Sequence, residues 1–171
     1  MSSPASILVG VGRAVYVKVQ GKGSFQNSPA LKEFARRMFD RGHRTFIVDL
    51  GGCPVMDSTF MGTLAGIALR LREAGSGSLR VANVNERNFD LLRNLGLNNL
   101  FEIVSKPAER TDRDGAVTQA PLEPGQTTRS DQAACMIEAH EALVDADPEN
   151  LARFRDVLDY LKQDLRTGTS K

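Results

Sequence analysis

The side chains best suited to chemistry stand in series where a predicted strand ends and a predicted helix begins. Asp57, Ser58 and Thr59 directly precede an apolar pattern of helical spacing. The first backbone N–H groups of a helix have no partners within it, so this position favours negative charge. A serine hydroxyl there can accept a phosphate, or it can simply cap the helix. Asp49 and Asp57 are the only carboxylates near the motif, and an acid/base pair also needs a pocket, so Asp57 is better placed to cap or orient the helix.

Other residues of chemical interest form weaker patterns. Cys53 and Cys135 are far apart and form no CxxC pair, which favours reduced cytosolic thiols. His43 and His140 are too few to build a metal cluster. Gly10-Val11-Gly12 lies in an expected β-hairpin, not at the strand-to-helix turn that a dinucleotide site needs. We therefore expect a protein that is not an enzyme and that carries no cofactor and no metal.

Strand and helix patterns alternate over the first 104 residues and must position this motif. Strand–helix–strand units need crossover connections, so we expect an α/β fold with a mixed, largely parallel sheet covered by helices. The expected strands are 7–11, 14–19, 45–50, 79–84 and 100–104, and the expected helices are 28–42 (Ser28 as N-cap, Gly42 as terminator), 58–74 and 86–95.

The chain changes character after residue 106. Residues 107–129 are polar and rich in Pro and Gly, which predicts a flexible linker. A helical hairpin is expected over residues 130–166, with Asp147-Pro148-Glu149 opening its second helix. Apolar stripes mark its two helices: Ala133, Ile137 and Val144 in the first, and Leu151, Phe154, Leu158, Leu161 and Leu165 in the second.

Charge divides the chain in the same place. Residues 1–106, here called the body, carry 14 Lys and Arg and 8 Asp and Glu, a net +6. The remainder carries 8 and 13, a net −5. A lone helical hairpin rarely stays folded. It therefore either docks on the body, where it could shield Ser58 as an autoinhibitory lid, or self-associates with another copy.

Two classes of target are disfavoured by the same composition. The basic residues of the body are scattered and lack an aromatic-rich motif, so no direct nucleic-acid binding is expected. No apolar run is long enough for a membrane span or a signal peptide, which predicts a cytoplasmic protein without membrane contact.

The motif at Ser58 resembles a known family. The string Asp57-Ser58-Thr59-Phe60-Met61-Gly62 is similar to the Asp-Ser-Ser/Thr-Gly-Leu/Met-Gly string of the STAS domain, the fold of bacterial anti-sigma factor antagonists. Asn83-Val84-Asn85, Phe89-Asp90-Leu91-Leu92 and Leu95-Gly96-Leu97 also resemble the end of that domain. The resemblance covers residues 5–106 and leaves the helical hairpin as an extension outside the family.

This resemblance implies a protein of a partner-switching pathway. Ser58 would be the phosphoacceptor, and the partners would be an anti-sigma factor that is also a serine kinase and a PP2C-type phosphatase. The residues implied to flank the phosphosite and form the partner surface are Asp57, Thr59, Phe60, Met61, Gly62, Gly23 and Ser24.

Two departures from the family pattern leave alternatives open. Phe60 replaces the usual glycine, and it either fills a core gap or stands on the partner face. The loop from Gly21 to Phe25 lacks the acidic Gly-Glu-Leu/Phe-Asp pattern. A non-phosphorylated STAS scaffold within a larger regulatory or lipid-transport assembly is therefore an alternative. A module that binds a nucleotide or lipid at the same helix N-terminus is another.

Overall fold

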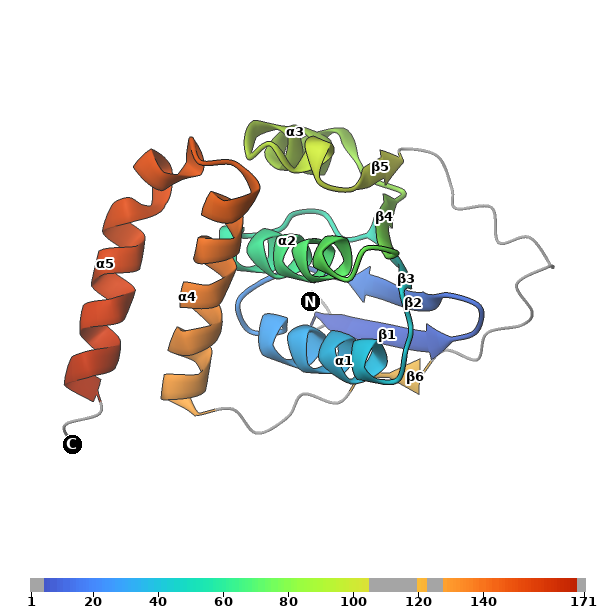
Figure 1. Cartoon of the computed structure of the whole chain (residues 1–171), viewed down its shortest axis with the longest axis horizontal. Coiled ribbons are helices and arrows are strands. Elements are labelled where there is room, and N and C mark those ends of the chain that lie inside the picture. Colours follow the sequence, from blue (N-terminus) through green and yellow to red (C-terminus); the bar gives the residue numbers. More distant parts are fainter. Residues whose placement is uncertain (1–4, 105–119, 123–127, 169–171) are drawn as a thin grey trace.

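The fold is built on a six-stranded mixed sheet with the strand order β5-β4-β3-β2-β1-β6. The structure is a computed structural model, and it describes residues 5–104, 120–122 and 128–168 (Figure 1). The strands are β1 (Ser6–Val11), β2 (Val15–Gln20), β3 (Thr45–Gly52), β4 (Ser78–Ala82), β5 (Glu102–Val104) and β6 (Ala120–Pro121).

The pairing of these strands confirms the predicted mixed sheet. β1 and β2 form the expected antiparallel β-hairpin, and β2, β3, β4 and β5 then pair in parallel. β6 adds an antiparallel strand beside β1, with Val9 opposite Ala120. This short strand falls within the predicted linker, most of which lies outside the described residues.

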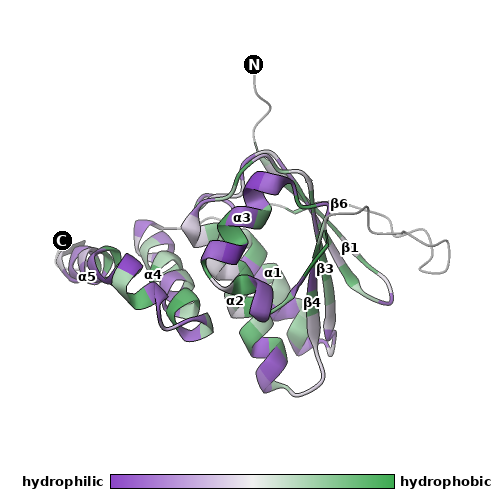
Figure 2. Cartoon of the chain, turned by 90° about the horizontal axis from the view of Figure 1, so that it is seen from above, coloured by the Kyte–Doolittle hydropathy of each residue, from purple (hydrophilic) through white to green (hydrophobic). Residues whose placement is uncertain are grey.

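Helices cover one face of the sheet. They are α1 (Ser28–Asp40), α2 (Ser58–Glu73), α3 (Glu86–Asn94) and the short 3₁₀ helix η1 (Leu97–Asn99), followed by α4 (Arg129–Ala146) and α5 (Asn150–Gly168). Seen from above, α1, α2 and α3 lie directly on the sheet, and α4 and then α5 lie farther out on the same side (Figure 2). The alternation of β2 explains this arrangement, because Val15, Val17 and Val19 are buried while Tyr16 and Lys18 are only partly so.

Helix boundaries correct two predictions. Ser28 is the first residue of α1 and Asn27 is its N-cap, while the Ser28 hydroxyl donates to the Ser24 carbonyl at 2.7 Å. Asp147 ends α4 instead of opening the next helix: its backbone N–H donates to Leu143, and its side chain accepts from Glu149 N–H in the turn. Helix α5 therefore starts at Asn150.

The helical hairpin, formed by α4 and α5, packs on the body of its own chain in this structure. Ala142 and Leu143 of α4 belong to the same buried apolar cluster as the sheet and α2. Helix α5 packs on α4, where Leu158 and Leu161 are buried, whereas Leu151 is 40% exposed. None of the described helices combines the length and the apolar character needed to cross a membrane.

Candidate functional site

Asp57 holds the start of α2 and connects it to the loop before α1. It is the N-cap of α2, as predicted, and its Oδ1 accepts from Phe60 N–H at 2.9 Å. Its Oδ2 accepts from Phe25 N–H, also at 2.9 Å. Both carboxylate oxygens therefore have backbone donors, and Ser58 becomes the first residue of the helix.

Gly23 explains why a phenylalanine is tolerated in the motif. The Gly23 N–H donates to Val55 O at 3.0 Å, and its carbonyl accepts from Asp57 N–H at 2.8 Å. A Cβ on Gly23 would lie 2.8 Å from the Phe60 ring, so a side chain has no room there. Phe60 itself is 0% exposed. Of the two positions that the motif allows, Phe60 thus occupies the core.

The burial of the predicted site residues separates two of them from the rest. Asp57 and Ser58 are only partly buried. The remaining residues predicted to form the partner surface are buried in this structure: Gly23, Ser24, Thr59, Phe60, Met61 and Gly62. Their role at a partner surface stays a prediction. In this structure they pack beneath Asp57 and Ser58 as buried residues.

His140 of α4 contacts Ser58 directly. The Ser58 hydroxyl lies 2.9 Å from His140 Nε2, and His140 Nδ1 lies 2.6 Å from the Met136 carbonyl oxygen. A carbonyl oxygen only accepts, so in the neutral ring Nδ1 carries the proton and Nε2 accepts from the Ser58 hydroxyl. The imidazole is 3% exposed and its ring edge packs on Phe154, with centroids 5.1 Å apart.

No local pattern pairs His140 with Ser58, but a signal for the docking of α4 exists. Cys135, Ala139 and Ala142 are small residues spaced three and four apart, and all are buried. A Cβ on Gly62 would lie 2.2 Å from the Ala139 carbonyl oxygen, so α2 and α4 approach backbone to backbone. Such a face is marked by small residues instead of the large ones that define an apolar stripe.

The Ser58 hydroxyl and the His140 imidazole form the one pair of chemically active side chains that the described residues bring together at this motif. A serine hydroxyl bonded to an imidazole is the pairing that activates nucleophiles, but there a further group usually orients the base. Here the second ring nitrogen meets a backbone carbonyl, and α4 lies over the serine. Among the described residues, no three His, Cys, Asp or Glu side chains are grouped to hold a metal ion.

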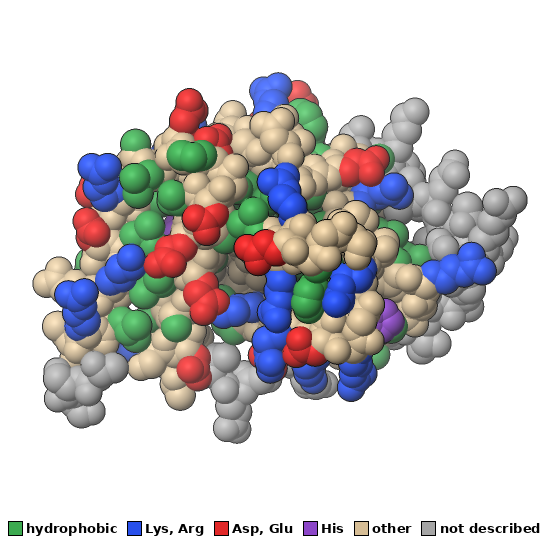
Figure 3. All heavy atoms as spheres, viewed as in Figure 1, with side chains coloured by type: hydrophobic (Ala, Val, Ile, Leu, Met, Phe, Trp, Pro, Cys, Tyr) green, Lys and Arg blue, Asp and Glu red, His purple; other side chains and the backbone are tan. Residues whose placement is uncertain are grey.

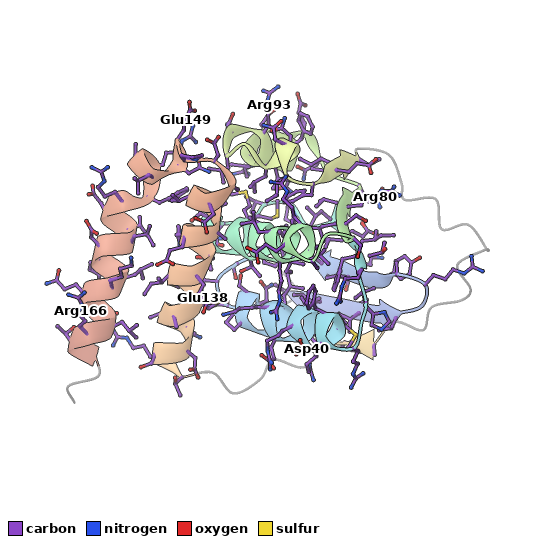
Figure 4. All side chains as sticks on the ribbon, in the orientation of Figure 1. Asp40, Arg80, Arg93, Glu138, Glu149 and Arg166 are labelled. Atoms are coloured by element: carbon purple, nitrogen blue, oxygen red, sulfur yellow. The ribbon has the colours of Figure 1, made fainter. Side chains whose placement is uncertain are left out.

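A cavity of about 220 Å³ lies apart from Ser58, between α1, α2 and α4. Phe39, Phe46 and Ile67 form part of its apolar wall, and Lys32 and Arg70 contribute basic side chains. Lys32 pairs with Glu138, which is labelled on α4 in Figure 4, and Arg70 pairs with Asp40. These two cations of the wall are thus already neutralised by the protein.

Comparison with known proteins places the body in a family. The STAS domain model matches residues 6–110. A crystal structure of TM1081 from Thermotoga maritima, a candidate anti-sigma factor antagonist, aligns with a TM-score of 0.54 and 18% identity over 65% of this chain and 92% of that chain. An NMR structure of TM1081 aligns with a TM-score of 0.52 and 19% identity over 64% and 84%.

These similarities have different weight. At such identities the two structures show a shared fold and nothing finer. No curated protein matches the chain. The helical hairpin lies beyond the residues that the family model matches. Because that match spans more than half of the chain and the fold agrees with it, the chain belongs to the STAS domain family.

Proposed function

We propose that this protein is a cytoplasmic anti-sigma factor antagonist that acts by partner switching. With Ser58 unmodified it binds an anti-sigma factor that is also a serine kinase, and phosphorylation of Ser58 releases it. A PP2C-type phosphatase restores the binding form. One observation carries this proposal: of the two hydroxyls in the motif, Ser58 is partly accessible at the helix start, while Thr59 is only 5% exposed.

The electrostatics of the helix start supports release without unfolding. A phosphate adds a charge of about −1.5 to −2. The N-terminus of α2 tolerates such a charge, because its first N–H groups and the helix dipole favour anions. The adjacent Asp57 carboxylate repels it, however, and a partner surface would have to desolvate both groups. Binding is therefore lost while the fold is kept.

Phosphate mapping tests this proposal. The full chain is incubated with Mg²⁺-ATP and a serine kinase that serves as an anti-sigma factor, and the modified residue is located by mass spectrometry. We expect one phosphate, on Ser58, and none in Ser58→Ala. Thr59→Val is the matched control and keeps the phosphate, because Thr59 is buried. A phosphate on another residue, or none on a chain that still binds the kinase, contradicts the proposal.

A non-phosphorylated scaffold is the second candidate, favoured by the hydrogen bond between Ser58 and His140. In that role the serine serves to hold α4, and the hairpin docks the chain into a larger regulatory or lipid-transport assembly. Partner binding would then be insensitive to the charge at Ser58. Equal retention of the partner by Ser58→Ala and Ser58→Asp selects this candidate over the first.

A further inference from the structure

Helix α4 lies on α2 where the phosphosite is. It runs across the N-terminal halves of α1 and α2 (Figure 1). Ser58 and Gly62, one helical turn apart, both meet it: the serine through His140 and the glycine through the Ala139 backbone. We call this part of α2 the Ser58–Gly62 face. It accepts a helix only if that helix presents a small residue, as α4 does with Ala139.

Charged side chains line the edge of the contact between α4 and the body. Acidic side chains gather over α4 beside basic side chains over α1 and α2 (Figure 3). Lys32 of α1 and Glu138 of α4 form an ion pair across this contact, and their side chains are 44% and 58% exposed. Exposed pairs of this kind contribute little to stability. Release of α4 therefore loses little from this ion pair, and its main cost is the separation of Leu143 from the core.

A phosphate on Ser58 cannot coexist with the docked helix in this geometry. The Ser58 hydroxyl and His140 Nε2 are already at hydrogen-bond distance, 2.9 Å, so no phosphoryl group fits between them. The segment after residue 106 also carries a net charge of −5, which opposes a second anion beneath α4.

We propose that α4 is a displaceable cover that competes with the partner for the Ser58–Gly62 face. Docked, it holds the Ser58 hydroxyl in the hydrogen bond to His140 and keeps the partner off this face. Released, it exposes a face that takes a partner helix with a small residue at its closest approach, in the place of Ala139. This inference rests on the proposed function for the identity of the partner, whereas the docking itself can be tested without one.

Cys135 reports the position of α4 in the full chain. Its thiol is 4% exposed and lines the cavity between α1, α2 and α4, so it faces the body. Burial raises its pKa, which further slows its reaction in the docked state. Cys53 is 1% exposed within the body and serves as an internal control. Alkylation by N-ethylmaleimide, followed for each cysteine by mass spectrometry, measures release.

Two glycines of α2 provide a matched pair of variants. Gly62→Ala places a Cβ 2.2 Å from the Ala139 carbonyl and should speed Cys135 alkylation by about tenfold or more, with Cys53 unchanged. Gly66→Ala adds the same methyl group in the same helix, but 3.7 Å from the nearest side chain, and should react like wild type. Ser58→Glu should also speed Cys135. If Cys135 is alkylated as slowly in both Gly62→Ala and Ser58→Glu as in wild type, the proposal that α4 can be displaced is overturned.

Competition is tested from the α4 side, which leaves the face itself intact. Ala139→Leu enlarges the residue that meets Gly62 and should raise affinity for the anti-sigma factor by about tenfold. Ala152→Leu, the same change at an exposed position of α5, should have no effect. If Ala139→Leu speeds the alkylation of Cys135 but leaves the affinity for the anti-sigma factor unchanged, α4 and the partner do not compete for this face. Ser58 can still be the phosphoacceptor in that case. Absence of phosphate on Ser58 overturns the proposed function while the Cys135 result stands.

Discussion

At the scale of single residues, Ser58 lies between two groups with different origins in the sequence. Asp57 is its neighbour, and a cap-competent acid before a helical pattern predicts its role from local physics alone. His140 is 82 positions away, and no local rule connects it to the serine. The first contact was predictable because it belongs to one helix start. The second depends on how two helices dock.

Phe60 shows the same limit, because its place in the motif allowed either the core or the partner face. Its complete burial predicts that Phe60→Ala lowers the free energy of unfolding by about 3–5 kcal/mol, through lost transfer energy and a cavity. Urea unfolding followed by circular dichroism measures this. Phe25→Ala is the control, since Phe25 is 37% exposed and should change stability by about 0.5 kcal/mol or less. Similar midpoints for both variants would refute the assigned burial.

At the scale of elements, apolar spacing predicted the inner faces of the body helices. Phe34 of α1 and Leu64 of α2 are 6% and 0% exposed, as their stripes indicate. Each change to Ala should cost about 2–5 kcal/mol. Chemical denaturation of each variant is the measurement, with exposed Ala152→Ser of α5 as a neutral comparison. Unchanged midpoints would mean that these helices present other faces to the sheet.

The same rule failed for α4. Ile137 and Val144, which spacing assigns to its inner stripe with Ala133, are only partly buried, whereas Cys135, Ala139 and Leu143 are buried. Spacing weights large apolar residues, but close approach to Gly62 requires small ones. The partner of a helix determines which of its faces is buried, and that partner is not visible in the local pattern.

The turn between α4 and α5 is held by one buried side chain. Asn150 is 1% exposed, and its Nδ2 donates to Leu95 O at 2.9 Å and to Leu143 O at 2.8 Å. Asn150→Ala removes both donors from buried carbonyls, which should cost about 1–3 kcal/mol. Hydrogen exchange should speed up in α4 and α5 and stay slow in β3. Asn98→Ala, at an exposed position, is the control. Equal exchange in the two variants would mean that Asn150 does not hold this turn.

At the scale of the whole molecule, the body has counterparts among solved structures, whereas the helical hairpin lies outside the family match. The solved structures of TM1081 align over 92% and 84% of their own length and over about two thirds of this chain, so a related fold stands without the hairpin. The opposite net charges of the two segments favour docking of the hairpin on the body. They do not indicate the place of contact, which depends on Gly62 and the small residues opposite it.

Truncation tests whether the hairpin docks in solution. The cut belongs before Thr128, because an earlier cut after Lys106 would also remove β6. We expect a folded monomer with a lower melting temperature, since loss of Leu143 alone forfeits about 1.5–3 kcal/mol of burial. Light scattering and thermal melts give the readout. A full-length dimer and a truncated monomer of equal stability would instead indicate self-association through the hairpin.

Control of partner binding by the charge on Ser58 can be measured by isothermal titration of the anti-sigma factor. Wild type and Ser58→Asp are each titrated as the full chain and as the chain ending at residue 127. Using both lengths separates the charge from any release of α4. In the chain ending at residue 127 we expect Ser58→Asp to bind at least about tenfold more weakly than wild type, on the order of 1.4 kcal/mol, with an unchanged circular dichroism spectrum. In the full chain we expect a smaller loss, because the added charge also releases α4 and exposes the Ser58–Gly62 face. Equal affinity of Ser58→Asp and wild type in the chain ending at residue 127 would contradict charge control at Ser58.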